Sequence, residues 1–84
     1  LLVITTSGNS RNILEVLQEA KKRDIYSLGF LGNEGGKALD YCDSAFIVPS
    51  DETARIQEAH ITAGHALLQF IEDRLIETGW LNKI

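Results

Sequence analysis

The chain begins with LLVITTSGNS (residues 1–10), an apolar run that leads into four hydroxyl side chains around a glycine. Residues 1–4 have the short apolar pattern that is typical of a buried parallel strand. In residues 10–23, apolar side chains recur at positions 13, 16, 17 and 20, which is the spacing of an amphipathic helix. A strand, a hydroxyl-rich loop and a helix in this order predict the first unit of a parallel α/β sheet.

The rest of the chain continues this alternation of strands and helices. We expect strands over residues 25–31 and 45–48, a short helix over residues 37–42, and a long helix from residues 50–53 to about residue 77, closed by Thr78 and Gly79. This order predicts an α/β fold of three layers, in which helices flank a parallel sheet. Because Leu1 already lies in a strand-like run, we expect residues 1–84 to be the second half of one domain.

The composition argues against nucleic-acid binding and against a membrane segment. The formal net charge is −4, and the eight Lys and Arg residues are scattered, whereas nucleic-acid binding usually requires a basic patch. No apolar run approaches the roughly 20 residues of a membrane span. The single cysteine, Cys42, suits a reducing cytoplasm, and we interpret it as a small apolar side chain that fills space.

The hydroxyl cluster of residues 5–10 predicts an anion site. Ligands of open parallel sheets bind beyond the carboxyl ends of the strands, and a helix N-terminus attracts anions. Gly8 would let the backbone approach a ligand closely. A capped turn explains one or two hydroxyls. A phosphate cradle uses all four, namely those of Thr5, Thr6, Ser7 and Ser10. The lysine and the glycine spacing of a nucleotide P-loop are absent from this stretch.

Several polar residues of the long helix are candidates for a functional site. Gln57 and His65 are separated by roughly 80° around the helix and about 12 Å along it, so they share a side, and one ion between them would need ligands from another helix. His65 by itself fits either a structural, hydrogen-bonded histidine or a functional one. His60 lies about 140° around the helix from His65, which favours a structural or interfacial role. Glu58 either orients His65 or pairs with Arg55 at the surface.

An apolar seam follows the same long helix. Apolar side chains and one glycine recur at steps of three and four, and two further apolar residues lie beyond the helix: Ile61, Gly64, Leu68, Ile71, Leu75, Trp80 and Leu81. A monomer rarely leaves so much apolar surface exposed. The pattern therefore predicts a homo-oligomer.

These motifs resemble a known family over nearly the whole chain. TSGNS (residues 6–10) after a strand resembles the phosphosugar-binding loop of sugar isomerase (SIS) domains. RIQE (residues 55–58) followed by His65 is similar to the last helix of the phosphoheptose isomerases. GG (residues 35–36), before a short helix and an acidic approach to the third strand (Asp40 and Asp43), also fits that family. The resemblance corresponds to the second half of the family's domain.

The resemblance implies a fold, an activity and an assembly. The family has a flavodoxin-like or Rossmann-like parallel sheet, forms cytoplasmic homotetramers with active sites between subunits, and interconverts sedoheptulose 7-phosphate and D-glycero-D-manno-heptose 7-phosphate for heptose and lipopolysaccharide synthesis. Such an aldose–ketose isomerisation needs an acid and a base that are tuned near neutrality, and histidine suits this role.

The resemblance also implies roles for individual residues. The phosphate would be held by the loop hydroxyls of Thr5, Thr6, Ser7 and Ser10, although Thr5 stands where Ser is commoner in the family. Gln57 would contact both the substrate and a zinc ion, and His65 would be a zinc ligand and the catalytic acid/base. The family's other histidine and its glutamate base would belong to the other half of the domain.

Two alternatives within the SIS superfamily stay open. Non-catalytic members, which sense sugar phosphates or associate with a replication initiator, keep the loop but replace the histidine that matches His65. An etherase that acts on N-acetylmuramic acid 6-phosphate shares the loop without requiring the pattern of Gln57 and His65. The presence of His65 therefore favours the isomerase.

Overall fold

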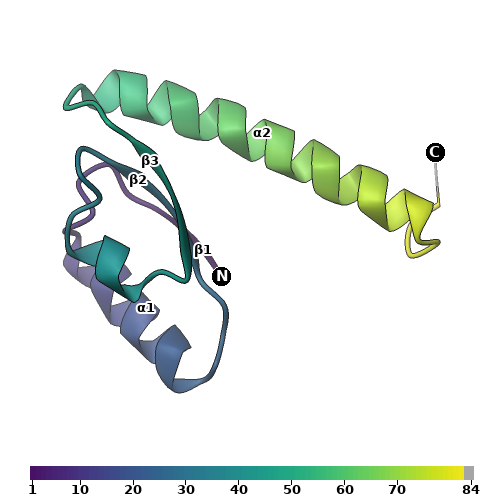
Figure 1. Cartoon of the computed structure of the whole chain (residues 1–84), viewed down its shortest axis with the longest axis horizontal. Coiled ribbons are helices and arrows are strands. Elements are labelled where there is room, and N and C mark those ends of the chain that lie inside the picture. Colours follow the sequence, from purple (N-terminus) through teal and green to yellow (C-terminus); the bar gives the residue numbers. More distant parts are fainter. Residues whose placement is uncertain (83–84) are drawn as a thin grey trace.

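The computed structural model describes residues 1–82, which form a three-stranded parallel sheet between two helical layers (Figure 1). The strands β1 (Leu2–Ile4), β2 (Leu28–Gly32) and β3 (Ser44–Val48) lie in the order β1-β2-β3. In register, Leu2 pairs with Leu28, and Leu28 pairs with Ser44. This arrangement confirms the predicted α/β fold with a parallel sheet.

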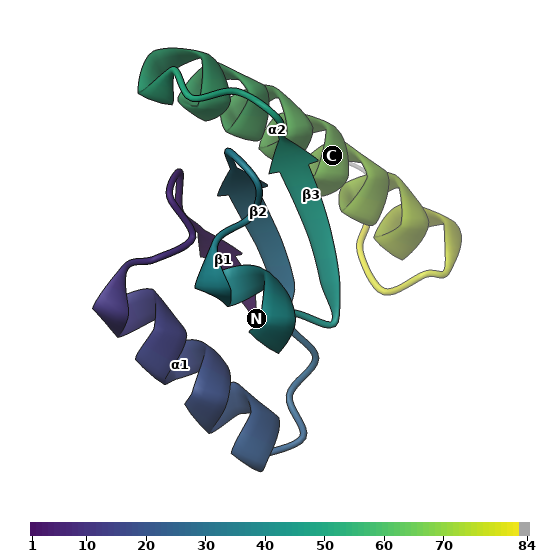
Figure 2. The ribbon, with the colours of Figure 1, turned by 60° about the vertical axis from the view of Figure 1, so that its left-hand side comes forward.

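The helical segments separate onto the two faces of the sheet. Helix α1 (Arg11–Lys22) and the 3₁₀ helix η1 (Lys37–Tyr41) lie on one face, whereas α2 (Thr53–Glu77) lies on the other (Figure 2). Side chains of a strand alternate between faces. Val3 therefore joins the core between the sheet and the first helical layer, with Leu17, Leu31 and Ala38.

Strand β2 begins three residues later than the predicted start at residue 25. The backbone N–H of Ile25 donates to the Ala20 carbonyl, so residue 25 still belongs to the turn that ends α1. The backbone N–H of Ser27 donates to the Asp43 carboxylate instead of to a neighbouring strand. These two bonds hold residues 25–27 outside the ladder, although their apolar pattern suits a strand.

Cys42 is partly buried against β2, in agreement with its interpretation as a space-filling side chain. A Cβ atom added to Gly29 would lie 2.6 Å from the Cys42 Sγ, so the sulfur occupies the space above that glycine. Burial raises the pKa of the Cys42 thiol, and the neighbouring charge of Asp43 raises it further. The thiol is therefore protonated at neutral pH, which disfavours reactivity.

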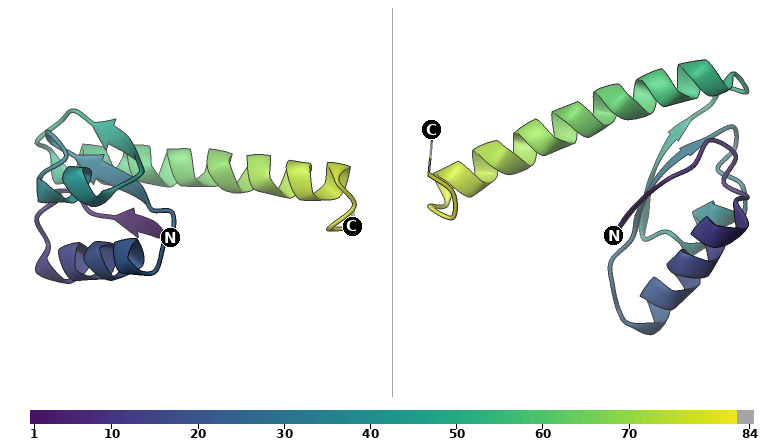
Figure 3. Two further views of the ribbon diagram at one scale, coloured as in Figure 1. Left: turned by 60° about the horizontal axis from the view of Figure 1, so that its bottom comes forward. Right: turned by 180° about the vertical axis from the view of Figure 1, so that it is seen from behind.

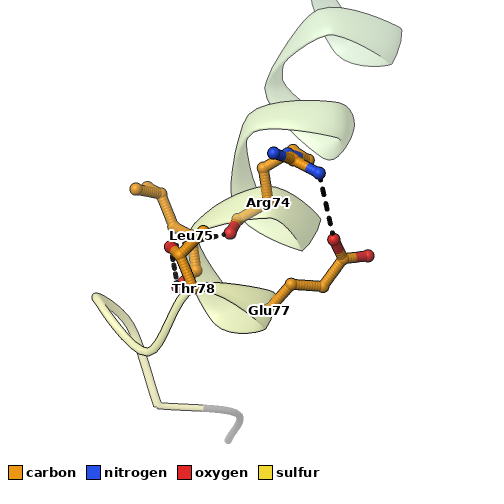
Figure 4. A network of polar contacts seen from close by, with 4 residues as sticks. All are labelled: Arg74, Leu75, Glu77 and Thr78. Carbon is orange, nitrogen blue, oxygen red and sulfur yellow. Dashed lines mark hydrogen bonds and ion pairs between the residues drawn. The ribbon is translucent and has the colours of Figure 1, made fainter.

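Helix α2 ends where the sequence predicts, at Thr78 and Gly79 (Figure 4). The Thr78 hydroxyl lies 2.9 Å from the Arg74 carbonyl oxygen and 3.2 Å from that of Leu75, so it satisfies acceptors of the last turn. Arg74 also pairs with Glu77 at 3.5 Å. Gly79 then reverses the chain with a φ of 83°, a conformation that glycine adopts without strain.

Much of α2 projects beyond the sheet (Figure 3). Among the 25 residues of this helix, the buried ones are Ile56 and His60. The predicted apolar seam is accordingly exposed, with Ile61 at 60% and Leu68 at 65% of full exposure. Trp80, beyond the helix, is 84% exposed. No helix within residues 1–82 combines the length and the apolar character needed to cross a membrane.

Candidate functional site

The loop of residues 5–10 is held in shape by its own hydroxyl groups. The Thr5 Oγ1 accepts a hydrogen bond from the Gly8 N–H at 3.2 Å and lies 3.3 Å from the Ser10 Oγ. The Ser7 Oγ accepts from the Asn9 N–H at 3.1 Å. Ser10 is the N-cap residue of α1, but its hydroxyl makes no capping bond. The structure thus brings Thr5 and Ser10 together at the start of α1.

Gly8 makes a close contact between two loops. Its φ is 72°, and a Cβ atom at this position would lie 2.0 Å from the Gly35 carbonyl oxygen. A Cβ atom on Gly36 would likewise lie 2.4 Å from the Ser7 carbonyl oxygen. The Gly8 carbonyl accepts from the Ala38 N–H at 2.8 Å. The glycine-rich loop after β2 therefore packs against the backbone of the hydroxyl loop at Ser7 and Gly8.

A first cavity, the strand-end groove, opens beyond the carboxyl ends of the strands. It has a volume of about 730 Å³ and is lined by Ser7, Asn9, Asn33, Glu34, Gly36, Pro49, Ser50 and Asp51. Of the four predicted phosphate residues, Ser7 lies in this lining. The carboxylates of Glu34 and Asp51 accept hydrogen bonds from hydroxyl groups and repel anions. The part of the strand-end groove next to these two carboxylates is therefore better suited to a sugar hydroxyl than to a phosphate.

A second cavity, the helix groove, lies between α2 and the edge of the sheet and contains both candidate residues of the helix. Its volume is about 480 Å³, and its lining is Leu2, Ile4, Phe30, Gln57, His60, Ile61, Gly64, His65, Leu67 and Leu68. Gln57 and His65 both line this groove, in agreement with the prediction that they share a side of the helix, and both are exposed. His65 is exposed in the described chain, which favours its functional interpretation over the structural one.

The buried histidine of α2 is His60, which fits the structural one of the two roles considered for it, structural or interfacial. It is 3% exposed, and its Nε2 lies 2.7 Å from the Leu31 carbonyl oxygen. Glu58 pairs with Arg55 at 2.7 Å, which is the second of the two roles considered for it. His65 is therefore exposed in the helix groove, whereas His60, which also lines this groove, is buried against the end of β2.

The two cavities share no lining residue, so the hydroxyl loop and the helix residues do not meet in one pocket of the described chain. Sequence reasoning also missed four polar residues of the strand-end groove: Asn33, Glu34, Ser50 and Asp51. A signal for them was present, because they directly follow the predicted second and third strands and must lie near the same edge as the hydroxyl loop.

The metal ligands that the chain itself can offer are incomplete. Within residues 1–82, no three His, Cys, Asp or Glu side chains gather closely enough to hold an ion. Gln57 and His65 offer one amide oxygen and one imidazole on the same groove, whereas zinc usually takes four ligands. The donors are chemically suitable, but they make up only part of a site.

Comparisons with known proteins show what the chain is similar to. The chain is 49% identical over 73 residues to the phosphoheptose isomerase of a Nitratiruptor species, with 87% of this chain and 39% of the relative covered. It is also 49% identical over 74 residues to that of Thermodesulfovibrio yellowstonii, covering 88% of this chain and 37% of the relative. No protein-family model matches the chain.

Solved structures agree with the sequence relatives. The phosphoheptose isomerase of Neisseria gonorrhoeae matches with a TM-score of 0.82 and 40% identity, over 84% of this chain and 41% of that one. The enzyme from Francisella tularensis matches with a TM-score of 0.83 and 39% identity, over 87% and 40%. In sequence and in fold, the chain is therefore a homologue of the phosphoheptose isomerases, and it spans about 40% of their length.

Proposed function

We propose that this chain is the C-terminal part of a single SIS domain in a phosphosugar isomerase of the cytoplasm. The reaction is the interconversion of sedoheptulose 7-phosphate and D-glycero-D-manno-heptose 7-phosphate, which supplies heptose for lipopolysaccharide. The observation that carries this proposal is the likeness to phosphoheptose isomerases, at 49% identity over 87% of the chain. The hydroxyl loop ahead of α1 and the exposed His65 supply residues suited to that chemistry.

In the proposed mechanism, one set of residues binds the phosphate and another residue transfers a proton. The hydroxyls of Thr5, Thr6, Ser7 and Ser10 hold the phosphate at the start of α1, where the helix N-terminus favours negative charge. Binding there orients the distant reacting carbons. Isomerisation first removes a proton from the carbon beside the carbonyl and gives a proton to the carbonyl oxygen, which forms an enediol. A proton then adds to the former carbonyl carbon, and the neighbouring hydroxyl loses its proton to become the new carbonyl. His65 moves one of these protons, and Gln57 contacts the sugar from the same groove.

Gln57 and His65 are also the residues that would hold zinc, with further ligands from the part of the protein outside this chain. When bound, a divalent ion polarises the carbonyl or holds the sugar hydroxyls. The experiment uses the full-length polypeptide that contains this chain. We expect isomerisation of sedoheptulose 7-phosphate that is lost on chelation and restored by zinc. Substrate binding without turnover would instead support the non-catalytic, phosphosugar-binding alternative.

The first prediction concerns the hydroxyl loop. Replacing both Ser7 and Ser10 with Ala should weaken sugar-phosphate binding, because each hydroxyl bonded to a charged group contributes about 1.5–3 kcal/mol. Calorimetric titration with sedoheptulose 7-phosphate measures the change. Ser44→Ala, at the opposite end of the sheet, is the matched control and should bind normally. Unchanged affinity of the double variant would remove the loop from the site.

The second prediction concerns assembly. We propose that the exposed apolar seam of α2 is part of a homotetramer interface, which would also bring residues of other copies to the helix groove. Ile71, which is 42% exposed, is expected to lie in this interface. Light scattering at micromolar concentration should show a tetramer for the full-length protein and smaller species for Ile71→Glu. Gln69→Lys, with its side chain next to Asp73, should leave the mass unchanged. A monomeric unsubstituted protein would refute the proposal.

A further inference from the structure

The helix that carries both candidate ligands places two buried side chains against the sheet. Ile56 and His60, one turn apart, are the buried residues of α2. Both contact the end of β2. Atoms of Ile56 lie 2.6 and 2.8 Å from the position that a Cβ atom on Gly32 would take, so Ile56 fills the space above that glycine. His60 reaches the carbonyl oxygen of Leu31, the preceding residue of the strand.

The chemistry of this contact determines where the imidazole carries its proton. A carbonyl oxygen only accepts hydrogen bonds, so the Nε2 of His60 is the donor in the 2.7 Å contact. The ring lies beside two aromatic side chains, with centroid distances of 5.8 Å to Phe30 and 6.4 Å to Phe46. The Nδ1 atom is buried and has no hydrogen-bond partner among the described residues. Because an apolar side chain would fill this site without an unpartnered nitrogen, the imidazole contributes chiefly its directional bond.

A hydrogen bond restrains the rotation of a helix about its axis more narrowly than apolar contact does. Apolar packing such as that of Ile56 restrains the rotation of α2 less narrowly, because the hydrophobic effect is non-directional. A bond from His60 to a strand carbonyl sets the rotation of the helix about its axis. Since a helix turns as a unit, this rotation also sets the directions of Gln57 and His65, which line the same groove as His60.

We propose that His60 is a positioning residue, which locks the rotation of α2 through the Leu31 carbonyl so that Gln57 and His65 face one ion and one substrate. This inference rests on the proposed function. His60 itself binds neither the metal nor the sugar. Its effect reaches the site only through the orientation of the helix.

Substitutions at position 60 distinguish the contribution of the hydrogen bond to Leu31 from the contribution of side-chain volume. In His60→Gln, the side-chain amide N–H can occupy the place of the imidazole Nε2–H and donate to Leu31. In His60→Asn the amide is too short to do so, and in His60→Leu the volume is filled without any donor. We expect His60→Gln in the full-length protein to keep zinc affinity within about threefold. The other two should lose about 10–100-fold, the usual effect of removing a group that orients a ligand.

The measurements are zinc competition with a chromophoric chelator, steady-state kinetics and thermal unfolding. Turnover should fall with zinc affinity in the Asn and Leu variants, whereas KM should change less, because the phosphate loop is untouched. Equal losses for the Gln and Leu variants would overturn the proposal, and so would wild-type zinc affinity in the Leu variant. A loss that merely follows the melting temperature in all three variants would mean that His60 is structural only.

A second readout needs neither zinc nor substrate. Nitrogen-15 NMR of the metal-free protein should show His60 protonated at Nε2 and bare at Nδ1, and amide exchange in α2 should accelerate in His60→Leu but not in His60→Gln. The opposite tautomer, or unchanged exchange, would refute the positioning role. If the unsubstituted protein binds no zinc, the proposed function fails, and these two measurements still decide the role of His60.

Discussion

Replacing His65 with Gln is expected to lower isomerase turnover by about 100-fold or more, the usual contribution of a positioned acid or base. The substitution removes an imidazole from the helix groove, while the side chain is exposed and supports no buried contact of the described chain. Thermal stability should therefore stay close to that of the unsubstituted protein. Zinc occupancy should fall together with turnover, because a site with few protein ligands does not tolerate the loss of one.

The measurement combines steady-state kinetics, metal analysis and thermal unfolding of the full-length polypeptide. Phosphate binding through the hydroxyl loop should persist, so the variant should still bind sedoheptulose 7-phosphate. Thr62→Ala, which removes an exposed hydroxyl from the same helix, is the control and should match the unsubstituted protein. A His65→Gln protein that is stable, zinc-loaded and fully active would contradict both the role of His65 and the isomerase proposal.

Among the substitutions in these predictions, Gly8→Ala is expected to lower the free energy of unfolding the most. Two costs add at this position. A non-glycine residue at a φ of 72° is strained by about 1–2 kcal/mol, and the new Cβ atom would lie 2.0 Å from the Gly35 carbonyl oxygen. Because that atom belongs to the backbone, relief requires the two loops to separate, at a further cost of about 1–3 kcal/mol. The free energy of unfolding, measured by urea denaturation, should fall by the sum.

Gly79 provides the matched control. Its φ of 83° is similar, but a Cβ atom there would meet no atom within 4 Å. Gly79→Ala should therefore carry the strain of the backbone without the collision. The difference between the two variants measures the close approach of the loops. Equal destabilisation of Gly8→Ala and Gly79→Ala would mean that the contact with Gly35 contributes nothing. Sugar-phosphate binding should weaken in Gly8→Ala alone, since only that variant disturbs the hydroxyl loop.

The order and the ends of the elements were predictable because their signals are local. The apolar spacing in residues 10–23 identified α1 to within one residue at each end, with Ser10 at its N-cap. Thr78 and Gly79 marked the end of α2, since a hydroxyl and a residue with positive φ satisfy the last turn of a helix within its own sequence. The start of β2 was not predictable, because the bond between Ser27 and Asp43 joins residues 16 positions apart.

The candidate site was likewise predictable only where its features depend on local spacing. Helical geometry places Gln57 and His65 on one side of α2 and His60 elsewhere, and the sequence alone determines these angles. It does not determine which side of the helix meets the sheet. That choice belongs to the contacts of Ile56 and His60 with the end of β2, and it buries His60 and exposes His65.

The sequence by itself therefore determined the alternation of strands and helices, the hydroxyl loop ahead of α1 and the relative angles of the polar residues on α2. These features depend on the spacing of side chains along a regular backbone. Only the tertiary structure decided that the backbone of Gly35 lies too close to Gly8 for a Cβ atom, and that His60 is the buried histidine. It also decided that the hydroxyl loop and the helix residues face separate grooves. The physical reason is that close packing acts between segments far apart in the chain, and local spacing does not determine which of their atoms meet.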